Sequence, residues 1–191
     1  MSSLFARGIE DRRRLASQLD KQAGILEAMA NAIIAALESG HRLYLFGNGG
    51  SAADAQHIAA EFVGRFKRER KALPAVALTT DTSTLLAIGN DYGFDHVFSR
   101  QVEALVQAGD VVWALSTSGD SANVVYAVRA ARDRGACVIA FTGRTGGNLK
   151  PLCDHCFCVE HDVSDRIQEI HQVAYHLICD AVEAHFASTG T

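Results

Sequence analysis

A glycine-rich turn between two apolar segments constrains this chain more than any other feature. Gly47, Gly49 and Gly50 follow the short apolar run 42–46, and an alanine-rich run begins at Ser51. Glycine allows a tight turn and a close approach of the backbone to a ligand, and serine caps a helix whose free N–H groups attract anions. The stretch therefore predicts a strand, a turn and a helix that hold a phosphate or sugar ligand. An ordinary strand-to-helix turn remains the alternative.

Two common phosphate motifs do not fit this turn. Position 52 is alanine, so the third glycine of a dinucleotide-binding Gly-x-Gly-x-x-Gly is missing, and the turn lacks the lysine of a P-loop. The turn alone thus indicates a class of ligand without naming it. His57 and Glu61 strengthen the functional interpretation, because residues four apart share one face of a helix.

Apolar segments alternate with helix-like segments along the rest of the chain. Because these segments are nearly all apolar, the pattern favours an α/β fold with a parallel sheet covered by helices on both faces. The predicted strands are 42–46, 75–80, 111–115, 137–142 and 156–160; the predicted helices are 51–66, 82–88, 95–107, 122–134 and 165–187; and 89–93 is predicted to be a polar loop.

The first 40 residues show helical periodicity before any strand. Apolar residues recur on one helical face within 8–39, Gly24 is a candidate break and Gly40 is a candidate stop. Such a segment cannot bury its apolar side alone, so it packs on the sheet or meets another subunit. At 191 residues the chain is predicted to be one domain, with a helical arm at 1–40 and an α/β core at 41–191.

Charge and cysteine content narrow the classes of function. A formal charge of −4 does not indicate a basic surface that would bind nucleic acid. The sequence predicts neither an apolar run long enough to span a bilayer nor a signal peptide. Five cysteines, an odd number, fit a reducing cytoplasm. The basic cluster 65–71 is predicted to be a solvated helix end, although Arg65 could reach an anionic ligand of a neighbouring subunit.

A second ligand signal follows the predicted strand 111–115. Hydroxyl side chains crowd the segment 116–121, where a helix is expected to begin, and both the hydroxyls and the helix N-terminus can hold phosphate oxygens. Ligands of open α/β sheets bind at the carboxyl ends of the strands, so this segment and the glycine turn are expected at one edge. Ordinary helix caps are the alternative. The hydroxyls belong to Ser116, Thr117, Ser118 and Ser121.

The last predicted helix begins with polar residues and continues with apolar ones, as expected where one end lines a pocket. Together with His57 and Glu61, its His176 could complete a divalent metal site, since imidazole and carboxylate suit zinc or a similar metal. A competing set lies in 153–161, with Cys153, Cys156 and Cys158 among its members. We discount this set because it has one Cys-x-x-Cys without a second pair, and because Cys156 and Cys158 fit one face of a strand as small apolar residues.

Three separated segments resemble one known family. They are Gly47-Asn-Gly-Gly-Ser-Ala-Ala-Asp-Ala-Gln-His57, Ser116-Thr-Ser-Gly119 and Asp165-Arg-Ile-Gln-Glu-Ile-His171. The chain is similar over nearly its whole length to the sugar isomerase (SIS) domain proteins, and most of all to the phosphoheptose isomerases among them. The resemblance implies a five-stranded parallel sheet in a three-layer sandwich, a homotetramer with sites shared between subunits, and a bound zinc ion.

The resemblance also implies an activity and the residues that perform it. Members convert sedoheptulose 7-phosphate to D-glycero-D-manno-heptose 7-phosphate, the first step towards the heptose of lipopolysaccharide and other surface glycans. Glu61 is the expected base and His176 the expected carrier of hydroxyl protons, through an enediol. The metal ligands would be His57, Glu61, Gln168 and His176, and the substrate contacts would be Asn48, Gly49, Gly50, Ser51, Glu61, Asn90, Asp91, Ser116, Thr117, Ser118, Ser121, Asp165 and Gln168.

Helix geometry does not easily accommodate one of these ligands. Gln168 and His176 are eight residues apart, about 12 Å along a helix axis. Gln172 and His176, four apart, would form the simpler pair. A helix distortion or a site shared between subunits would reconcile the family's pattern with this spacing.

Two other functions remain as alternatives. One SIS domain relative is not an enzyme and binds the bacterial replication initiator, but it lacks the acidic residue and the histidine that stand here as Glu61 and His176. The other alternative is an isomerase of a different phosphosugar, because the hydroxyls at 116–121 recognise only the phosphate.

Overall fold

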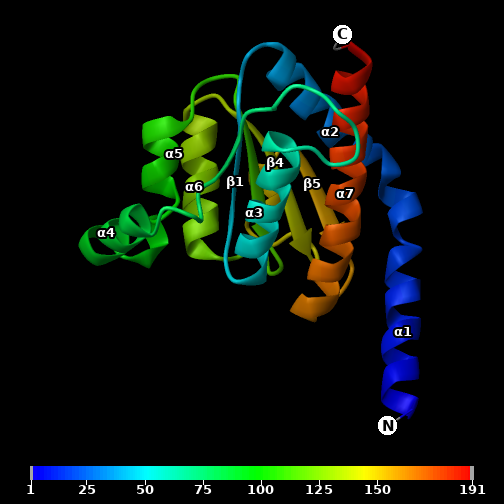
Figure 1. The fold of residues 1–191 in the computed structure, drawn as a ribbon. Coiled ribbons are helices and arrows are strands. Elements are labelled where there is room, and N and C mark those ends of the chain that lie inside the picture. Colours follow the sequence, from blue (N-terminus) through cyan, green and yellow to red (C-terminus); the bar gives the residue numbers. More distant parts are fainter. Residues whose placement is uncertain (1, 190–191) are drawn as a thin grey trace.

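The computed structural model describes residues 2–189, in which five parallel strands alternate with helices (Figure 1). The strands pair in the order β2-β1-β3-β4-β5, which confirms the predicted five-stranded parallel sheet. The order reverses between β1 and β3, the kind of position where α/β proteins bind ligands. The strands are β1 (Leu43–Gly47), β2 (Ala75–Ala77), β3 (Val111–Ser116), β4 (Cys137–Gly143) and β5 (His155–Val159).

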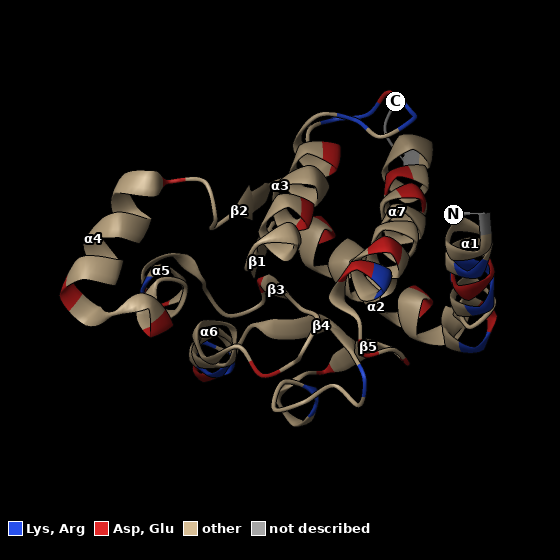
Figure 2. Cartoon of the chain, turned by 90° about the horizontal axis from the view of Figure 1, so that it is seen from below, with Lys and Arg blue, Asp and Glu red and all other residues tan. Residues whose placement is uncertain are grey.

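Helices cover both faces of the sheet, as Figures 1 and 2 show. One face carries α2 (Ala23–Glu38), α3 (Gly50–Val63) and α7 (Ser164–Thr189). The other carries α5 (Ser99–Leu105) and α6 (Ala122–Asp133). The predicted three-layer arrangement is therefore confirmed.

Alternate residues of the central strands build two separate hydrophobic cores. Trp113 and Leu115 of β3 belong to the core under α2, α3 and α7, whereas Val112 and Ala114 belong to the core under α5 and α6. Successive side chains of a strand point to opposite faces, so a strand covered on both sides must be apolar at every position. This explains the uninterrupted apolar runs in the sequence.

The N-terminal arm is interrupted earlier than predicted. Helix α1 (Ser2–Ala16) is followed by the short 3₁₀ helix η1 (Leu19–Gln22), and Gly24 lies inside the first turn of α2. The predicted break at Gly24 is therefore wrong. The change of element occurs where packing partners change, because α2 packs against α7 and β5 while α1 lies beside α7 alone in Figure 1.

Three predicted boundaries on the site side of the chain need correction. The helix predicted over 51–66 ends at Val63, and the strand predicted over 75–80 is the three-residue β2. The loop predicted over 89–93 is helical up to Tyr92, because the helix continues through Gly89 and stops at Gly93, whose φ is 89°. The resulting α4 (Thr82–Tyr92) begins at Asp81, whose side chain accepts a hydrogen bond from the backbone N–H of Thr84.

Three further elements complete the described chain. Two are the 3₁₀ helices η2 (Phe94–His96), which takes the start of the helix predicted over 95–107, and η3 (Lys150–Leu152). Helix α4 projects from the body beside α5 (Figure 1), and it has no buried residue. Within residues 2–189 no helix is long and apolar enough to cross a membrane.

Candidate active site

The glycine turn, residues 47–50, joins β1 to α3 at the switch point of the sheet. Gly49 has a φ of 55°, a conformation that glycine adopts without strain, and α3 begins at the next residue. The predicted cap at Ser51 is therefore wrong: Gly49 is the N-cap, and Ser51 is buried within the first turn of α3. A Cβ on Gly50 would come within 2.6 Å of the side-chain Nε2 of Gln168, so the end of this α7 side chain lies directly against the turn. The turn thus brings the start of α3 against the first turns of α7.

The hydroxyl turn, residues 116–121, lies beside the glycine turn as predicted. The Oγ of Ser116 is 3.4 Å from that of Ser118 and 3.3 Å from that of Ser121. Asn48 and Asn123 exchange two side-chain hydrogen bonds of 2.9 Å, which tie the start of α6 to the glycine turn. A hollow of about 60 Å³ lies here, lined by Asn48, Ser51, Leu115, Ser116, Thr117, Ser121 and Gln168.

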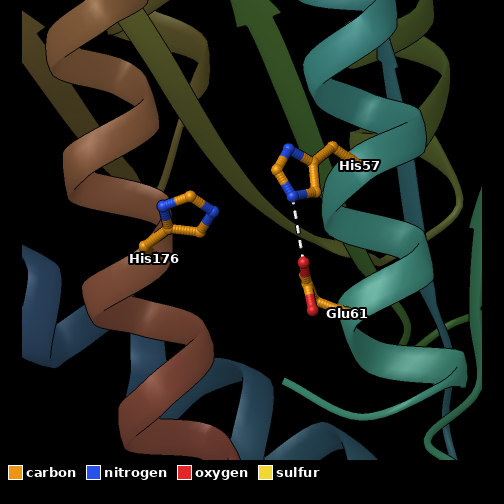
Figure 3. A group of neighbouring side chains, drawn as sticks. All are labelled: His57, Glu61 and His176. Atoms are coloured by element: carbon orange, nitrogen blue, oxygen red, sulfur yellow. Dashed lines mark hydrogen bonds and ion pairs between the residues drawn. The ribbon is translucent and has the colours of Figure 1, made fainter. Parts of the chain in front are cut away.

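His57, Glu61 and His176 form a group of possible metal ligands further along α3 and α7, called the metal group below (Figure 3). His57 Nε2 lies 2.9 Å from Glu61 Oε1, and the rings of His57 and His176 are 5.1 Å apart between centroids. One ligand atom from each of the three lies within 4.8 Å of the others, and among residues 2–189 this is the one such group of His, Cys, Asp or Glu. Nitrogen and carboxylate ligands in this number suit a catalytic zinc site with an open position.

The environment of His176 disfavours the protonated form of its imidazole. Burial, with the nearby His57, lowers the pKa of His176. The ring of Phe66 stacks on that of His176, with centroids 5.3 Å apart and 19° between the ring planes. A neutral imidazole is the form that binds a metal or accepts a proton.

A buried carboxylate, missed in the sequence, positions the loop that carries Phe66. Glu183 of α7 accepts hydrogen bonds from the backbone N–H groups of Phe66, Lys67 and Arg68, at 2.7, 2.7 and 2.8 Å. Burial opposes its ionisation, but these donors outweigh burial and hold the pKa of Glu183 below its usual value. These bonds also explain why α3 ends early, since the loop backbone is satisfied by α7.

The basic cluster 65–71 is therefore not simply a solvated helix end. Lys67 and Arg68 both pair with Asp180 of α7, and the Nε of the buried Arg70 side chain is 3.7 Å from Glu183. Arg65 is exposed, as its predicted approach to a neighbouring subunit requires. Figure 2 shows these basic residues along the loop beside the acidic positions of α7.

Two more residues behind His57 were also missed. Tyr175 Oη lies 3.0 Å from His57 Nδ1, and it donates a hydrogen bond of 3.4 Å to Asp54 Oδ1. Burial raises the pKa of Asp54 and that of Tyr175. The spacing of Asp54, three residues before His57 and therefore on the same helical face, is a signal that could have found it.

Several predicted residues lie away from the metal group in this chain. Gln168 lies at the glycine turn rather than beside His176, so its predicted ligation needs a rearrangement. Asp165 is exposed and pairs with Arg166 at 2.6 Å. Asn90 and Asp91 are on α4, where the Asn90 amide donates to the Asp91 carboxylate. Within one chain, α4 does not approach α3 or α7 (Figure 1).

The cysteine cluster, Cys153, Cys156 and Cys158, does not gather around one point. Cys156 Sγ and Cys158 Sγ are 3.6 Å apart on one face of β5, as predicted, but both side chains are half-buried and line a hollow. The thiol of Cys153, together with burial, raises the pKa of Cys156 to about 11, and Cys156 with burial raises that of Cys158. A raised pKa disfavours the thiolate, which is the form that binds metals.

Comparison with known proteins agrees with this geometry. Residues 9–143 match the SIS domain family. A phosphoheptose isomerase from a Bradyrhizobium species is 58% identical over 158 residues, which cover 83% of this chain and 80% of the relative. Another from Aquifex aeolicus is 56% identical over 155 residues, 81% of each chain.

A solved structure gives the same answer for the fold. The phosphoheptose isomerase of Neisseria gonorrhoeae superposes with a TM-score of 0.91 at 45% identity, covering 96% of this chain and 98% of that one. The identity is far above the level at which only the fold is shared. This chain therefore belongs to the SIS domain family, within its phosphoheptose isomerases.

Proposed function

We propose that the protein isomerises sedoheptulose 7-phosphate to D-glycero-D-manno-heptose 7-phosphate in the cytoplasm, the first step of heptose biosynthesis. The observation that carries the proposal is the alignment of two sites along α3 and α7. The hydroxyl turn lies at the level of Gly50 and Gln168, and the metal group lies further along the same two helices. One end suits a phosphate and the other suits a carbonyl and its neighbouring hydroxyl.

The separation of these sites favours a long sugar. His57 follows Gly50 by seven residues, which corresponds to about 10 Å along the helix axis. An extended seven-carbon chain with a terminal phosphate is about this long, and a pentose phosphate is two carbons shorter. This supports a heptose over the alternative of a shorter phosphosugar.

The chain's own residues account for the proton transfers. Glu61 takes a proton from C1 of the ketose and the electron pair forms the C1–C2 double bond, which leaves the negative charge on O2. The neutral ring of His176 carries the proton of O1 to O2 through the enediol, and C2 takes the proton back from Glu61 as the aldehyde forms at C1. The non-enzymatic alternative is disfavoured because both groups are present and adjacent.

A zinc ion fits the three ligand side chains. His57, Glu61 and His176 would hold it, and when bound it would polarise the carbonyl oxygen of the substrate. The lowered pKa of His176 supports this assignment, since a neutral ring is ready to bind a metal. In this arrangement Gln168 serves as a substrate contact at the glycine turn.

Assembly with further copies would complete the site. Large apolar side chains are exposed on α1 (Leu4, Phe5) and around α4 (Leu86, Tyr92), which an oligomer would cover. A homotetramer would let Asn90 and Asp91 reach the substrate of a neighbouring subunit, with Asp165 contributing beside it. Sedimentation analysis would test the assembly directly.

An assay with purified protein and sedoheptulose 7-phosphate tests the activity, with and without a chelator. Formation of the aldoheptose phosphate that is lost with the metal and returns on adding zinc is the expected result. No conversion by metal-loaded protein would refute the proposed reaction. Conversion of a pentose phosphate in preference to the heptose would refute the argument from length.

A further inference from the structure

A chain of three polar side chains lies behind the metal group. Tyr175 Oη of α7 is within hydrogen-bond distance of two groups of α3, His57 Nδ1 at 3.0 Å and Asp54 Oδ1 at 3.4 Å. The Tyr175 side chain is completely buried and Asp54 is half-buried. Because the hydroxyl carries a single hydrogen, it can donate to one of these two groups and must accept from, or ignore, the other.

Of these two groups, the Asp54 carboxylate is the stronger acceptor for that hydrogen. An ionised carboxylate can only accept, and hydrogen bonds to charged acceptors are about twice as strong as neutral ones. Among residues 2–189, the Tyr175 hydroxyl is the hydrogen-bond donor recorded for the Asp54 side chain, whose other oxygen, Oδ2, is buried without a partner. The hydroxyl hydrogen therefore points to Asp54. The oxygen of Tyr175, which also has a hydrogen bond with the side chain of Gln172, keeps a lone pair that can accept from His57.

This direction decides where His57 can keep its proton when a cation is bound. A neutral imidazole has one N–H, which either donates from Nε2 to Glu61 Oε1, 2.9 Å away, or donates from Nδ1 to the Tyr175 oxygen. A cation beside Nε2 and Glu61 requires the second arrangement, because Nε2 must then offer a lone pair. The hydrogen bond from Tyr175 to Asp54 leaves the Tyr175 oxygen able to accept the Nδ1 proton in that state.

We propose that Asp54 and Tyr175 are positioning residues that hold the proton of His57 on Nδ1 and so present Nε2, together with Glu61, to a divalent cation. The inference rests on the proposed function, whose metal it concerns, and it concerns residues that touch neither substrate nor metal. Without Asp54, the Tyr175 hydroxyl would donate to Nδ1. The ring proton would then move to Nε2, where its hydrogen bond to Glu61 would block both ligand atoms.

The hydrogen bond of the Nδ1 proton can be measured in zinc-loaded protein. NMR of ¹⁵N-histidine-labelled protein, at about pH 8.5, above the ordinary histidine pKa, detects the proton on Nδ1 of His57 and its exchange with solvent. We expect a slowly exchanging Nδ1 proton in the wild type and a faster exchanging one in Tyr175→Phe, which has no acceptor for it. Asp54→Asn should act in the same direction, because its amide donates to Tyr175 and frees the hydroxyl to compete for Nδ1.

A matched variant controls for the loss of a buried hydroxyl. Tyr44 is also buried, and its hydroxyl donates to the carbonyl oxygen of Leu105 away from the site. Tyr44→Phe should leave the His57 nitrogen signals unchanged. An unprotonated Nδ1 in the zinc-loaded wild type, or an Nδ1 proton that exchanges equally slowly in Tyr175→Phe, would overturn the inference.

Metal affinity gives a second readout that needs no substrate. Competition for zinc with a chromophoric chelator should show about 10- to 100-fold weaker binding to Tyr175→Phe than to the wild type or Tyr44→Phe. Equal affinity in all three would contradict the positioning role. Absence of heptose isomerisation by the wild type would refute the proposed function alone, because the NMR result stands without any turnover.

Discussion

His57, Glu61 and His176 lie between two packed helices, whereas Cys153, Cys156 and Cys158 lie along the edge strand β5 and just before it. Both sets contain residue types that bind metals. The first set brings three ligand atoms within 4.8 Å of one another, with Tyr175 behind one ring and Phe66 stacked on another. The cysteines form a row in which Cys153 raises the pKa of Cys156, and Cys156 raises that of Cys158. A metal site is distinguished by ligand atoms that lie around one point and by side chains held in the protonation form that binds a metal. Closeness of the residues in the sequence is not sufficient.

Among the single substitutions that test this comparison, the one at Glu61 should have the largest effect on turnover. We expect Glu61→Gln to lower kcat by at least about 10²- to 10⁴-fold, the usual contribution of a general base. Metal content must be measured in the same variant, because Glu61 is also a proposed ligand. Glu160→Gln beside the cysteines is the matched control and should retain turnover. Near-normal turnover in Glu61→Gln would remove its role as base.

Metal analysis separates the two clusters directly. The purified wild type should hold close to one zinc or similar ion per chain, and His57→Ala should lose it because three ligands are reduced to two. A variant with Cys153, Cys156 and Cys158 all changed to Ser should keep it. Elemental analysis that finds metal in His57→Ala and none in the triple cysteine variant would reverse the assignment.

The hydroxyl turn should affect binding more than stability. Removing a hydrogen bond to a charged partner costs about 1.5–3 kcal/mol, so Ser118→Ala with Ser121→Ala should weaken substrate binding by about tenfold or more for each hydroxyl. The melting temperature should change little, because the two side chains are partly exposed. Thr145→Ala, in the hollow near the cysteines, is the control. Unchanged affinity for sedoheptulose 7-phosphate in the double variant would argue against this phosphate site.

A third histidine of α7 tests the contrast between a ligand and a structural group. His171 is fully buried, its Nε2 is 3.0 Å from the carbonyl oxygen of Thr142, and burial lowers its pKa to about 4. The folded protein then binds fewer protons than the unfolded chain between about pH 6.5 and pH 4, so stability falls as the pH drops through this window. The full effect is about 3 kcal/mol.

Denaturant unfolding across that pH window measures this effect. His171→Gln should show a smaller loss of unfolding free energy on acidification than the wild type. Equal losses would mean that other groups set the acid sensitivity. Metal content should be unchanged in this variant, since His171 faces away from the metal group towards Phe141 and Phe157.

Much of the fold and part of the site could be predicted from the sequence. The glycine turn, the hydroxyl turn and the i, i+4 pair His57–Glu61 depend on local spacing, and the structure has each of them, although α3 begins at Gly50 and is not capped by Ser51. The family and the isomerase activity that it implies are confirmed by the relatives. The end of α3 could not be predicted in this way, because Glu183 fixes it from more than a hundred residues away. The partners of His57 and His176, Tyr175 and Phe66, likewise depend on how α7 packs against α3 and the following loop.

The central claim is that Glu61 moves a proton from C1 to C2 through an enediol, and following that hydrogen tests the claim most directly. Sedoheptulose 7-phosphate is converted by wild-type protein in D₂O, and the aldoheptose phosphate is analysed by proton NMR at C2. Because Glu61 exchanges its proton with solvent while the enediol is bound, the account predicts deuterium at C2 in at least part of the product. A product in which C2 carries only the protium transferred from C1, with no deuterium, would contradict the enediol and favour a hydride shift.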